Sequence, residues 1–262
     1  MPYSQISVEP PCRPLSPVAL RRSVGVERSV SALPGKGMLP EAQAFASERR
    51  TVTAGADLVS EFDGCGSLFI VVEGWFALKR ILEDGRQQIL DFVLPGGVIG
   101  DPSGRTRVMS YSVTALTDSA VAVIPQSRLP ELFRKSPATA MALMQSAHDA
   151  LSHAYDSLTD VGRRSAREAV ASFLLRMERR IRNSIGVRSD GSVEFPLTQE
   201  NIGDALGLTA VHVCRTLRAL SKEGVVSACR KGLDVADPER LADIAGAEPE
   251  WDEDAVPRYA VA

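Results

Sequence analysis

Cysteine and histidine are scarce in this sequence, with four and three residues respectively among 262. The cysteines are widely scattered, so no CxxC pair and no zinc-like spacing occurs. The three histidines give little support for a haem site. We therefore expect neither a metal ion nor another bound cofactor, and we expect a reducing cytoplasm as the location.

Long apolar runs are also missing. No stretch of 18 apolar residues occurs, so we expect no membrane span, and the N-terminus lacks the apolar core of a secretory signal. Nothing in the chain resembles a nucleophile–base pair, a P-loop or a metal constellation. We therefore do not expect an enzyme.

The chain as a whole lacks the positive charge that is typical of nucleic-acid binders, since its formal net charge is −3. The charge is unevenly distributed, however. Residues 162–232 contain 13 Lys and Arg against 7 Asp and Glu, an excess of six positive charges that leaves nine net negative charges for the rest. A partner with negative charge is therefore expected at this basic region.

The basic region contains the stretch PLTQENIGDALGLTAVHVCRTLRALSKEG, from Pro196 to Gly224. Thr198 can cap a first helix, which Gly207 ends because glycine adopts the left-handed conformation at little steric cost. Thr209 can cap a second helix. Two short helices joined in this way form a helix-turn-helix, whose second helix lies in the DNA major groove. An αα-hairpin in a helical core is the alternative.

The second of these helices has two different faces. Val213, Leu217 and Leu220 recur at the spacing of a buried stripe. The residues expected to point away from this stripe, toward DNA, are Val211, Cys214, Arg215 and Arg218.

The stretch LTQENIGDALGLTAVHVCRTLRALSKEGVV resembles the winged helix-turn-helix of the Crp/Fnr family of bacterial transcription regulators. GRRSAREAVASFLLRM, residues 162–177, is similar to the helix that enters that domain, and residues 39–135 are more loosely similar to the family's β-roll sensor. Both termini lie outside the resemblance. It implies a DNA-binding transcription regulator.

Strand signals before residue 130 agree with such a roll. Residues 67–81 are rich in β-branched and aromatic residues, Glu83–Arg86 contains the Asp-Gly pair of a primed hairpin turn, and residues 111–125 predict two further strands. We therefore predict an α+β fold with an antiparallel β-roll sensor domain, a long dimerisation helix and a C-terminal winged helix-turn-helix. The predicted segments are a disordered tail at 1–37, a cyclic-nucleotide-binding-like β-roll at 38–135, the dimerisation helix at 136–162, the DNA-binding domain at 163–245 and an acidic tail at 246–262.

The resemblance also implies an effector pocket, which is degenerate here. Cyclic-nucleotide sites of the family carry a Gly-Glu for the ribose and an Arg-Ser or Arg-Thr for the phosphate. Asp101 stands where the glutamate would be, and Met109 and Ser110 fall where the Arg-Ser would be. Burying a phosphate without a fixed cation is costly, and Arg105 and Arg107 lie at other offsets. We expect a regulator that does not depend on cAMP, with a different effector or none.

Residues 136–162 predict one long helix with apolar residues at mixed spacings of three and four, as in a coiled coil. The stripe contains Met141, Leu143 or Met144, Ala147, Leu151, Ala154, Leu158 and Val161. In the Crp/Fnr family the corresponding helix pairs with its twin, so the resemblance implies a homodimer with two reading heads about 34 Å apart. Packing of this helix on its own roll is the alternative.

The resemblance assigns DNA contacts to the second helix of the motif. Arg215 corresponds to a family arginine placed to bond guanine bidentately. A family glutamate that accepts from cytosine is replaced here by Val211, which can touch a thymine methyl group. His212 is either a DNA contact or a plain surface residue. Further expected contacts, mostly to phosphate, are Thr198, Gln199, Thr209 and Arg218 and, in the wing, Arg230 and Lys231.

Cys214 is a candidate redox switch. A thiol near a helix N-terminus and arginines oxidises readily, and the negative charge of a sulfinate would weaken DNA binding. A small packing residue is the alternative. The iron–sulfur sensors of the family need a cysteine cluster, mostly N-terminal, and only Cys12 and Cys65 are available on that side.

These observations predict a cytoplasmic homodimeric transcription regulator that binds a two-fold site on double-stranded DNA and contacts or blocks RNA polymerase. The rival hypothesis is a redox- or ligand-sensing module with weak, mainly nonspecific DNA binding.

Overall fold

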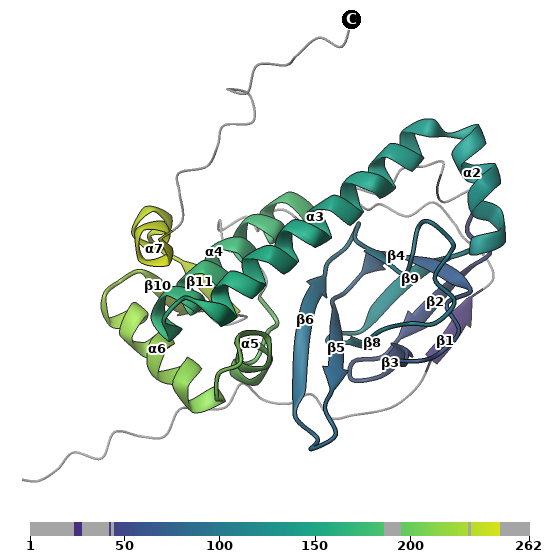
Figure 1. Ribbon diagram of the computed structural model, residues 1–262. Coiled ribbons are helices and arrows are strands. Elements are labelled where there is room, and N and C mark those ends of the chain that lie inside the picture. Colours follow the sequence, from purple (N-terminus) through teal and green to yellow (C-terminus); the bar gives the residue numbers. More distant parts are fainter. Residues whose placement is uncertain (1–23, 28–41, 43–44, 186–194, 230–231, 247–262) are drawn as a thin grey trace, which may run out of the picture.

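The computed structural model describes residues 24–27, 42, 45–185, 195–229 and 232–246 (Figure 1). A β-roll is followed by a long helix, α3 (Pro137–Gly162), which runs from the roll to a smaller C-terminal domain. This is the α+β architecture that the sequence predicts.

The roll consists of two antiparallel sheets. The first has the order β1 (Val24–Glu27), β2 (Glu48–Val52), β9 (Ser119–Pro125), β4 (Ser67–Glu73) and β7 (Val98–Ile99). The second has the order β3 (Asp57–Val59), β8 (Ser112–Ala115), β5 (Phe76–Ile81) and β6 (Gln87–Val93). Both sheets contribute to one core, in which Phe76, Ile99 and Val121 are almost completely buried. Burial of this shared apolar surface holds the two sheets together.

Strand β1 corrects one prediction. The sequence predicts a disordered tail over residues 1–37, but Val24–Glu27 pairs antiparallel with β2. Without it, β2 would be an edge strand with unpaired backbone groups, which readily accept another strand. The rest of that predicted tail, and residues 247–262 of the predicted acidic tail, lie outside the described part of the chain.

The hairpin between β5 and β6 forms as predicted, but its turn is of a different type. Asp84 does not adopt the positive φ of a primed turn, and only Gly85 does, at 84°. The carboxylate of Asp84 accepts hydrogen bonds from the backbone N–H of Arg86 at 3.0 Å and from its Nε at 2.7 Å. These bonds stabilise the local turn that the aspartate adopts instead.

Helices dominate the chain after β9. A short 3₁₀ turn, η1 (Gln126–Arg128), leads into α2 (Leu129–Lys135) and α3. The C-terminal domain consists of α4 (Ala166–Ser184), α5 (Gln199–Leu206), α6 (Ala210–Lys222), β10 (Val226–Cys229), β11 (Gly232–Val235) and α7 (Pro238–Ala245).

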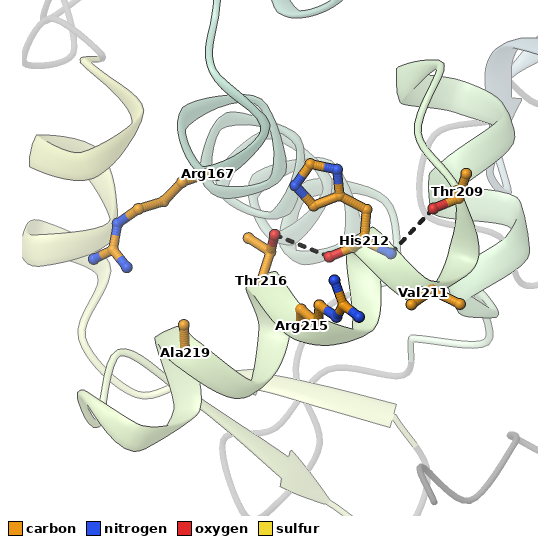
Figure 2. A pocket seen from close by; sticks show the side chains of 7 residues that line it. All are labelled: Arg167, Thr209, Val211, His212, Arg215, Thr216 and Ala219. Carbon is orange, nitrogen blue, oxygen red and sulfur yellow. Dashed lines mark hydrogen bonds between the residues drawn. The ribbon is translucent and has the colours of Figure 1, made fainter.

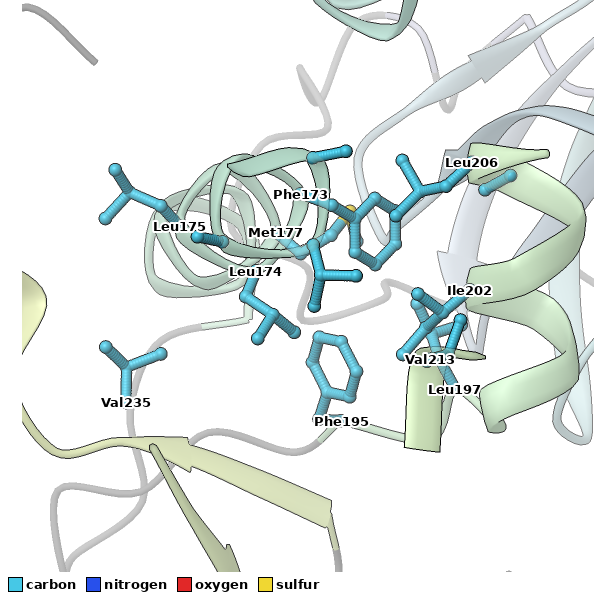
Figure 3. Close-up of a cluster of buried hydrophobic side chains, with 14 of the residues drawn as sticks. Phe173, Leu174, Leu175, Met177, Phe195, Leu197, Ile202, Leu206, Val213 and Val235 are labelled. Carbon is cyan, nitrogen blue, oxygen red and sulfur yellow. The ribbon is translucent and has the colours of Figure 1, made fainter. Parts of the chain in front are cut away.

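The C-terminal domain has its own apolar core, which extends into the roll. Phe173 from α4, Ile202 from α5 and Val213 from α6 are buried together (Figure 3). Phe92 from β6 joins the same cluster, with its ring edge-on to Phe173 at a centroid distance of 5.8 Å. The roll and the C-terminal domain therefore share packed side chains and are not separated by a linker.

Hydrogen bonds also join the roll to the C-terminal domain. Gln87 of β6 donates to Asp204 of α5 at 2.5 Å, and Gln88 donates to the carbonyl oxygen of Ala205 at 3.0 Å. Burial raises the pKa of Asp204 from its ordinary value, and the hydrogen bond from Gln87 partly offsets this rise. The first helix of the helix-turn-helix is thus positioned directly by a strand of the roll.

Asp160 joins α3 to α4. Its side chain is completely buried, and its two oxygens accept hydrogen bonds from Arg164 at 2.6 Å and Arg176 at 2.9 Å. Arg164 also donates to Ser172 of α4 at 3.0 Å. A buried carboxylate needs such partners, and here they set how α4 leaves the end of the long helix.

Candidate nucleic-acid interface

Two capped helices form the helix-turn-helix. Thr198 Oγ1 accepts from the backbone N–H of Asn201 at 3.1 Å, while Asn201 Oδ1 accepts from the backbone N–H of Thr198 at 3.0 Å. Gly207 ends α5 with a φ of 66°, and Thr209 caps α6 by accepting from the backbone N–H of His212 at 3.2 Å. The helices and both predicted caps are confirmed.

Gly203 allows the two helices to approach closely. A Cβ atom at this position would lie 2.5 Å from the carbonyl oxygen of Leu208, a distance that real Cβ atoms do not reach. The carbonyl oxygen of Gly203 also accepts a hydrogen bond from the backbone N–H of Leu208 at 2.9 Å. The turn therefore packs directly against α5, which fixes the angle at which α6 departs.

Helix α6 buries one face and exposes the other. Val213 and Leu220 are fully buried, while Val211 is 62% exposed although it is apolar. His212, Arg215 and Arg218 are exposed as well. The exposed face thus carries two guanidinium groups, an imidazole and an apolar side chain, which together can contact phosphates and base edges.

A groove of about 410 Å³ follows this exposed face (Figure 2). Its lining comes from α6, from the cap of α6 and from α4, and consists of Arg167, Thr209, Val211, His212, Arg215, Thr216 and Ala219. Thr216 is held by a hydrogen bond from its hydroxyl to the carbonyl oxygen of His212 at 3.0 Å. Thr216 and Ala219 were not among the expected contacts. Arg167 was expected only as one of several arginines around α4, one or two of which could reach phosphate.

Arg167 forms a two-pronged ion pair with Glu223, the residue that caps the C-terminal end of α6. Its two terminal nitrogens lie 2.7 and 2.6 Å from the two carboxylate oxygens. Arg240 of α7 lies 3.5 Å from the same carboxylate. The hydrogen bond from Arg167, reinforced by the nearby positive charges, lowers the pKa of Glu223 below its ordinary value.

The remaining expected contacts lie at the margins of this surface. Thr198 and Gln199 are half-buried at the start of α5, and Thr209 is exposed at the start of α6. Strands β10 and β11 pair antiparallel, with Val226 opposite Val235, so the predicted wing forms a hairpin. Its tip, Arg230 and Lys231, lies outside the described residues.

The expected outward position of Cys214 is wrong. Its side chain is only 7% exposed. Helix α6 packs against α5, α4 and β10, so its buried arc is wider than a single stripe and includes Cys214 and Thr216. Small side chains fit the edges of such an arc. The thiol therefore does not lie on the surface where oxidation would place a charge against DNA.

The expected effector residues do not converge on one cavity. The carboxylate of Asp101 accepts from the backbone N–H groups of Ser103, Arg105 and Thr106 and from the Ser103 hydroxyl, at 2.7–3.1 Å. Partial burial opposes ionisation of Asp101, but these hydrogen bonds dominate and hold its pKa well below the ordinary range. Met109 is buried in the core of the roll, and Ser110 is exposed.

A crevice of about 760 Å³ lies between the roll and helices α3 and α4. Gly100, Pro102 and Tyr111 line it from the roll, while Asp101, Met109 and Ser110 do not. The arginine that lines this crevice is Arg180 of α4, whose Nη1 lies 2.7 Å from a carboxylate oxygen of Asp91.

Arg105 and Arg107 line a separate hollow beside Cys65. Neither Arg105 nor Arg107 lines the crevice between the roll and helices α3 and α4, so neither supplies the cation that a phosphate bound there would need.

No group of three or more His, Cys, Asp or Glu side chains that could hold a metal ion occurs within the described ranges. In the same part of the chain, no helix is long and apolar enough to cross a bilayer.

Comparison with known proteins agrees with this geometry. Residues 168–244 match the Crp-like helix-turn-helix domain, and residues 49–136 match the cyclic nucleotide-binding domain. The chain is 34% identical over 196 residues to the nitrogen fixation regulation protein FixK of Bradyrhizobium diazoefficiens, covering 74% of this chain and 81% of that protein. It is 32% identical to the transcriptional activator protein FnrL of Cereibacter sphaeroides, covering 75% of this chain and 80% of that protein.

Among solved structures, FixK2 from Bradyrhizobium japonicum superposes with a TM-score of 0.68 at 28% identity, covering 77% of this chain and 98% of that one. These relatives are transcription regulators, which confirms the expectation that this chain is not an enzyme. The two matched domains and the relatives show that the chain belongs to the Crp/Fnr family and is a transcription regulator with a DNA-binding helix-turn-helix.

Proposed function

We propose that this regulator binds a two-fold site on double-stranded DNA as a homodimer and reads its sequence through α6. The observation that carries the proposal is the division of α6 into a buried face, locked by Val213 and Leu220, and an exposed face bearing Val211, His212 and Arg215. A helix fixed in this way can enter the major groove without changing the core behind it.

Base recognition would come mainly from Arg215. The exposed guanidinium of Arg215, in the second turn of α6, can donate two hydrogen bonds to O6 and N7 of guanine. Val211, one turn earlier, offers only an apolar surface, which suits the methyl group of thymine. Thr198, Gln199, Thr209 and Arg218 would contact the phosphates that flank the groove.

The proposed homodimer would form through α3. Its apolar side chains at six positions are between 48% and 70% exposed, which is unusual for a helix of a monomer: Met141, Met144, Leu151, Tyr155, Leu158 and Val161. Leu143, the alternative to Met144 in the predicted stripe, is buried with α2 and the roll. One face of the helix thus packs on its own roll, and the other is available to a second copy.

Control by cAMP is not part of this proposal. Asp101 is engaged by its own loop, Met109 is buried where the phosphate-binding arginine of the family would be, and Arg180 in the crevice is paired with Asp91. In the cytoplasm, the bound dimer would act by contacting RNA polymerase or by blocking it.

A sensing module with weak, mainly nonspecific DNA binding is the rival hypothesis. The crevice between the roll and α3 and α4 is the feature that favours it, since it could hold a ligand. The two hypotheses differ in whether DNA binding depends on base sequence.

Arg215→Ala tests the proposal. We expect a loss of about 1–3 kcal/mol on a selected specific site and little change on random DNA, because Arg215 would contact a base. Binding is measured by fluorescence anisotropy at one fixed salt concentration. Arg134→Ala, an exposed residue of α2 far from α6, is the matched control. Equal losses on specific and random DNA would refute base reading by Arg215.

A further inference from the structure

The ion pair between Arg167 and Glu223 lies at the DNA-binding groove. Arg167 lines the same groove as His212 and Arg215, but it comes from α4. Figure 2 shows it on this separate helix, beside the end of α6 that carries Ala219. If α6 occupies a major groove, a side chain at this position faces the sugar–phosphate backbone at the groove's edge.

The geometry of the pair is also that of a phosphate site. Nη1 of Arg167 donates to Oε1 of Glu223 at 2.7 Å, and Nη2 donates to Oε2 at 2.6 Å. The guanidinium fork binds carboxylates and phosphates in this same two-pronged manner, so a carboxylate in this place has the shape and charge of a phosphate contact.

We propose that Glu223 occupies the place of a DNA phosphate, and that Arg167 exchanges this carboxylate for the DNA backbone when α6 enters the major groove. The inference rests on the proposed function, and it adds a phosphate contact, Arg167, together with an internal competitor, Glu223.

The surroundings of Glu223 permit the exchange. The side chains of Arg167 and Glu223 are 40% and 32% exposed, so the pair is solvated and its loss costs little. Arg240 stays beside the carboxylate, with Nη2 at 3.5 Å, when Arg167 turns away. Arg240 also donates to the backbone carbonyl of Glu223 at 3.4 Å, which keeps it in place. The carboxylate is therefore not left without a cation.

The two partners have opposite effects on DNA binding under this proposal. Arg167→Gln removes one phosphate contact, so binding weakens equally on specific and random DNA, and the slope of log affinity against log salt becomes shallower by about 0.9. The ratio of wild-type to variant affinity then falls about 3.5-fold between 50 and 200 mM salt. Glu223→Gln removes the competitor, so binding tightens by about 1.4- to fivefold, the range that an exposed ion pair represents.

Two further variants separate this role from a purely structural one. Arg167→Lys keeps the charge but loses the two-pronged geometry, and we expect it to retain the wild-type salt slope. Combining Arg167→Gln with Glu223→Gln tests the coupling, because the gain from Glu223→Gln should shrink when Arg167 is absent. Circular dichroism and thermal melting of each variant establish that it is folded.

The experiment measures affinity by anisotropy at four salt concentrations, on a selected site and on random DNA, with Arg215→Ala in parallel. An unchanged salt slope in Arg167→Gln, or an undiminished gain from Glu223→Gln in its presence, overturns the exchange. If Arg215→Ala still loses only specific binding, the proposed function stands while this inference fails. If Arg215→Ala loses specific and random binding equally, the proposed base reading fails whatever Arg167 does.

Discussion

Asp160 connects the long helix α3 to the DNA-binding domain, and we expect Asp160→Asn to destabilise this junction. The substitution removes the negative charge but leaves Arg164 and Arg176 in place, with side chains only 22% and 12% exposed. Breaking a buried ion pair in this way typically costs about 3–5 kcal/mol, because the remaining charges stay poorly solvated. Since both arginines retain some access to water, we expect the lower end, about 3 kcal/mol.

A loss of this size lowers the melting temperature by roughly 6–12 °C in a chain of this length. The assay is thermal unfolding followed by circular dichroism at a fixed protein concentration, because the proposed dimer would make the melting temperature depend on concentration. Asp156→Asn, an exposed change one turn earlier on the same helix, is the control and should cost less than about 0.5 kcal/mol.

A second variant separates charge from shape. Replacing Asp160 by Leu together with Arg164→Met and Arg176→Met removes all three charges, and such apolar replacements are often neutral or stabilising. We therefore expect this triple variant to be more stable than Asp160→Asn. If Asp160→Asn costs less than about 1 kcal/mol, the arginines are effectively solvated, and Asp160 is not needed to neutralise them.

Three further predictions concern the dimer, the turn and the bases read. Leu158→Glu should raise the dimer dissociation constant, measured by sedimentation, about thirtyfold, which corresponds to a loss of roughly 2 kcal/mol at a packed interface. The exposed control Ser152→Glu should leave the dissociation constant unchanged. Equal dimerisation of the two variants would exclude α3 as the dimer interface. Gly203→Ala should lower the free energy of unfolding, measured by denaturant titration, by about 1–3 kcal/mol, because the alanine methyl group would overlap the Leu208 carbonyl oxygen. An unchanged free energy of unfolding would mean that the turn can shift. Val211→Glu should shift the selected half-site toward cytosine at one position by about 1–3 kcal/mol, and an unchanged motif would place this residue away from the bases.

Features that depend on neighbouring residues could be predicted from the sequence. Thr198, Gly207 and Thr209 fix the ends of α5 and α6 through bonds within a few residues, so their chemistry is visible in the sequence. The hairpin between β5 and β6 was predictable for the same reason. The turn type was not predictable, because the Asp84 carboxylate accepts hydrogen bonds from Arg86 and these stabilise a turn other than the primed one.

Features that depend on distant contacts could not be predicted. Cys214 lies about 100° around the helix from Val213, and its burial depends on how many elements surround α6. The pairing of Arg167 with Glu223 joins residues 56 positions apart. From the sequence alone, the Asp101 carboxylate could bind an effector or its own loop. The three-dimensional path of residues 103–106 brings their backbone N–H groups to this carboxylate, so it binds the loop.

Sequence reading by α6 is tested most directly by selecting bound DNA from a random pool, with purified reduced protein at a stated salt concentration, with and without cAMP. We predict an enriched two-fold motif whose half-sites lie about 10–10.5 base pairs apart or a multiple of this, independent of cAMP. Absence of any enriched motif, with only salt-sensitive binding, would contradict sequence reading by α6 and would favour the sensing module. Enrichment that requires cAMP would contradict a regulator whose DNA binding does not depend on cAMP.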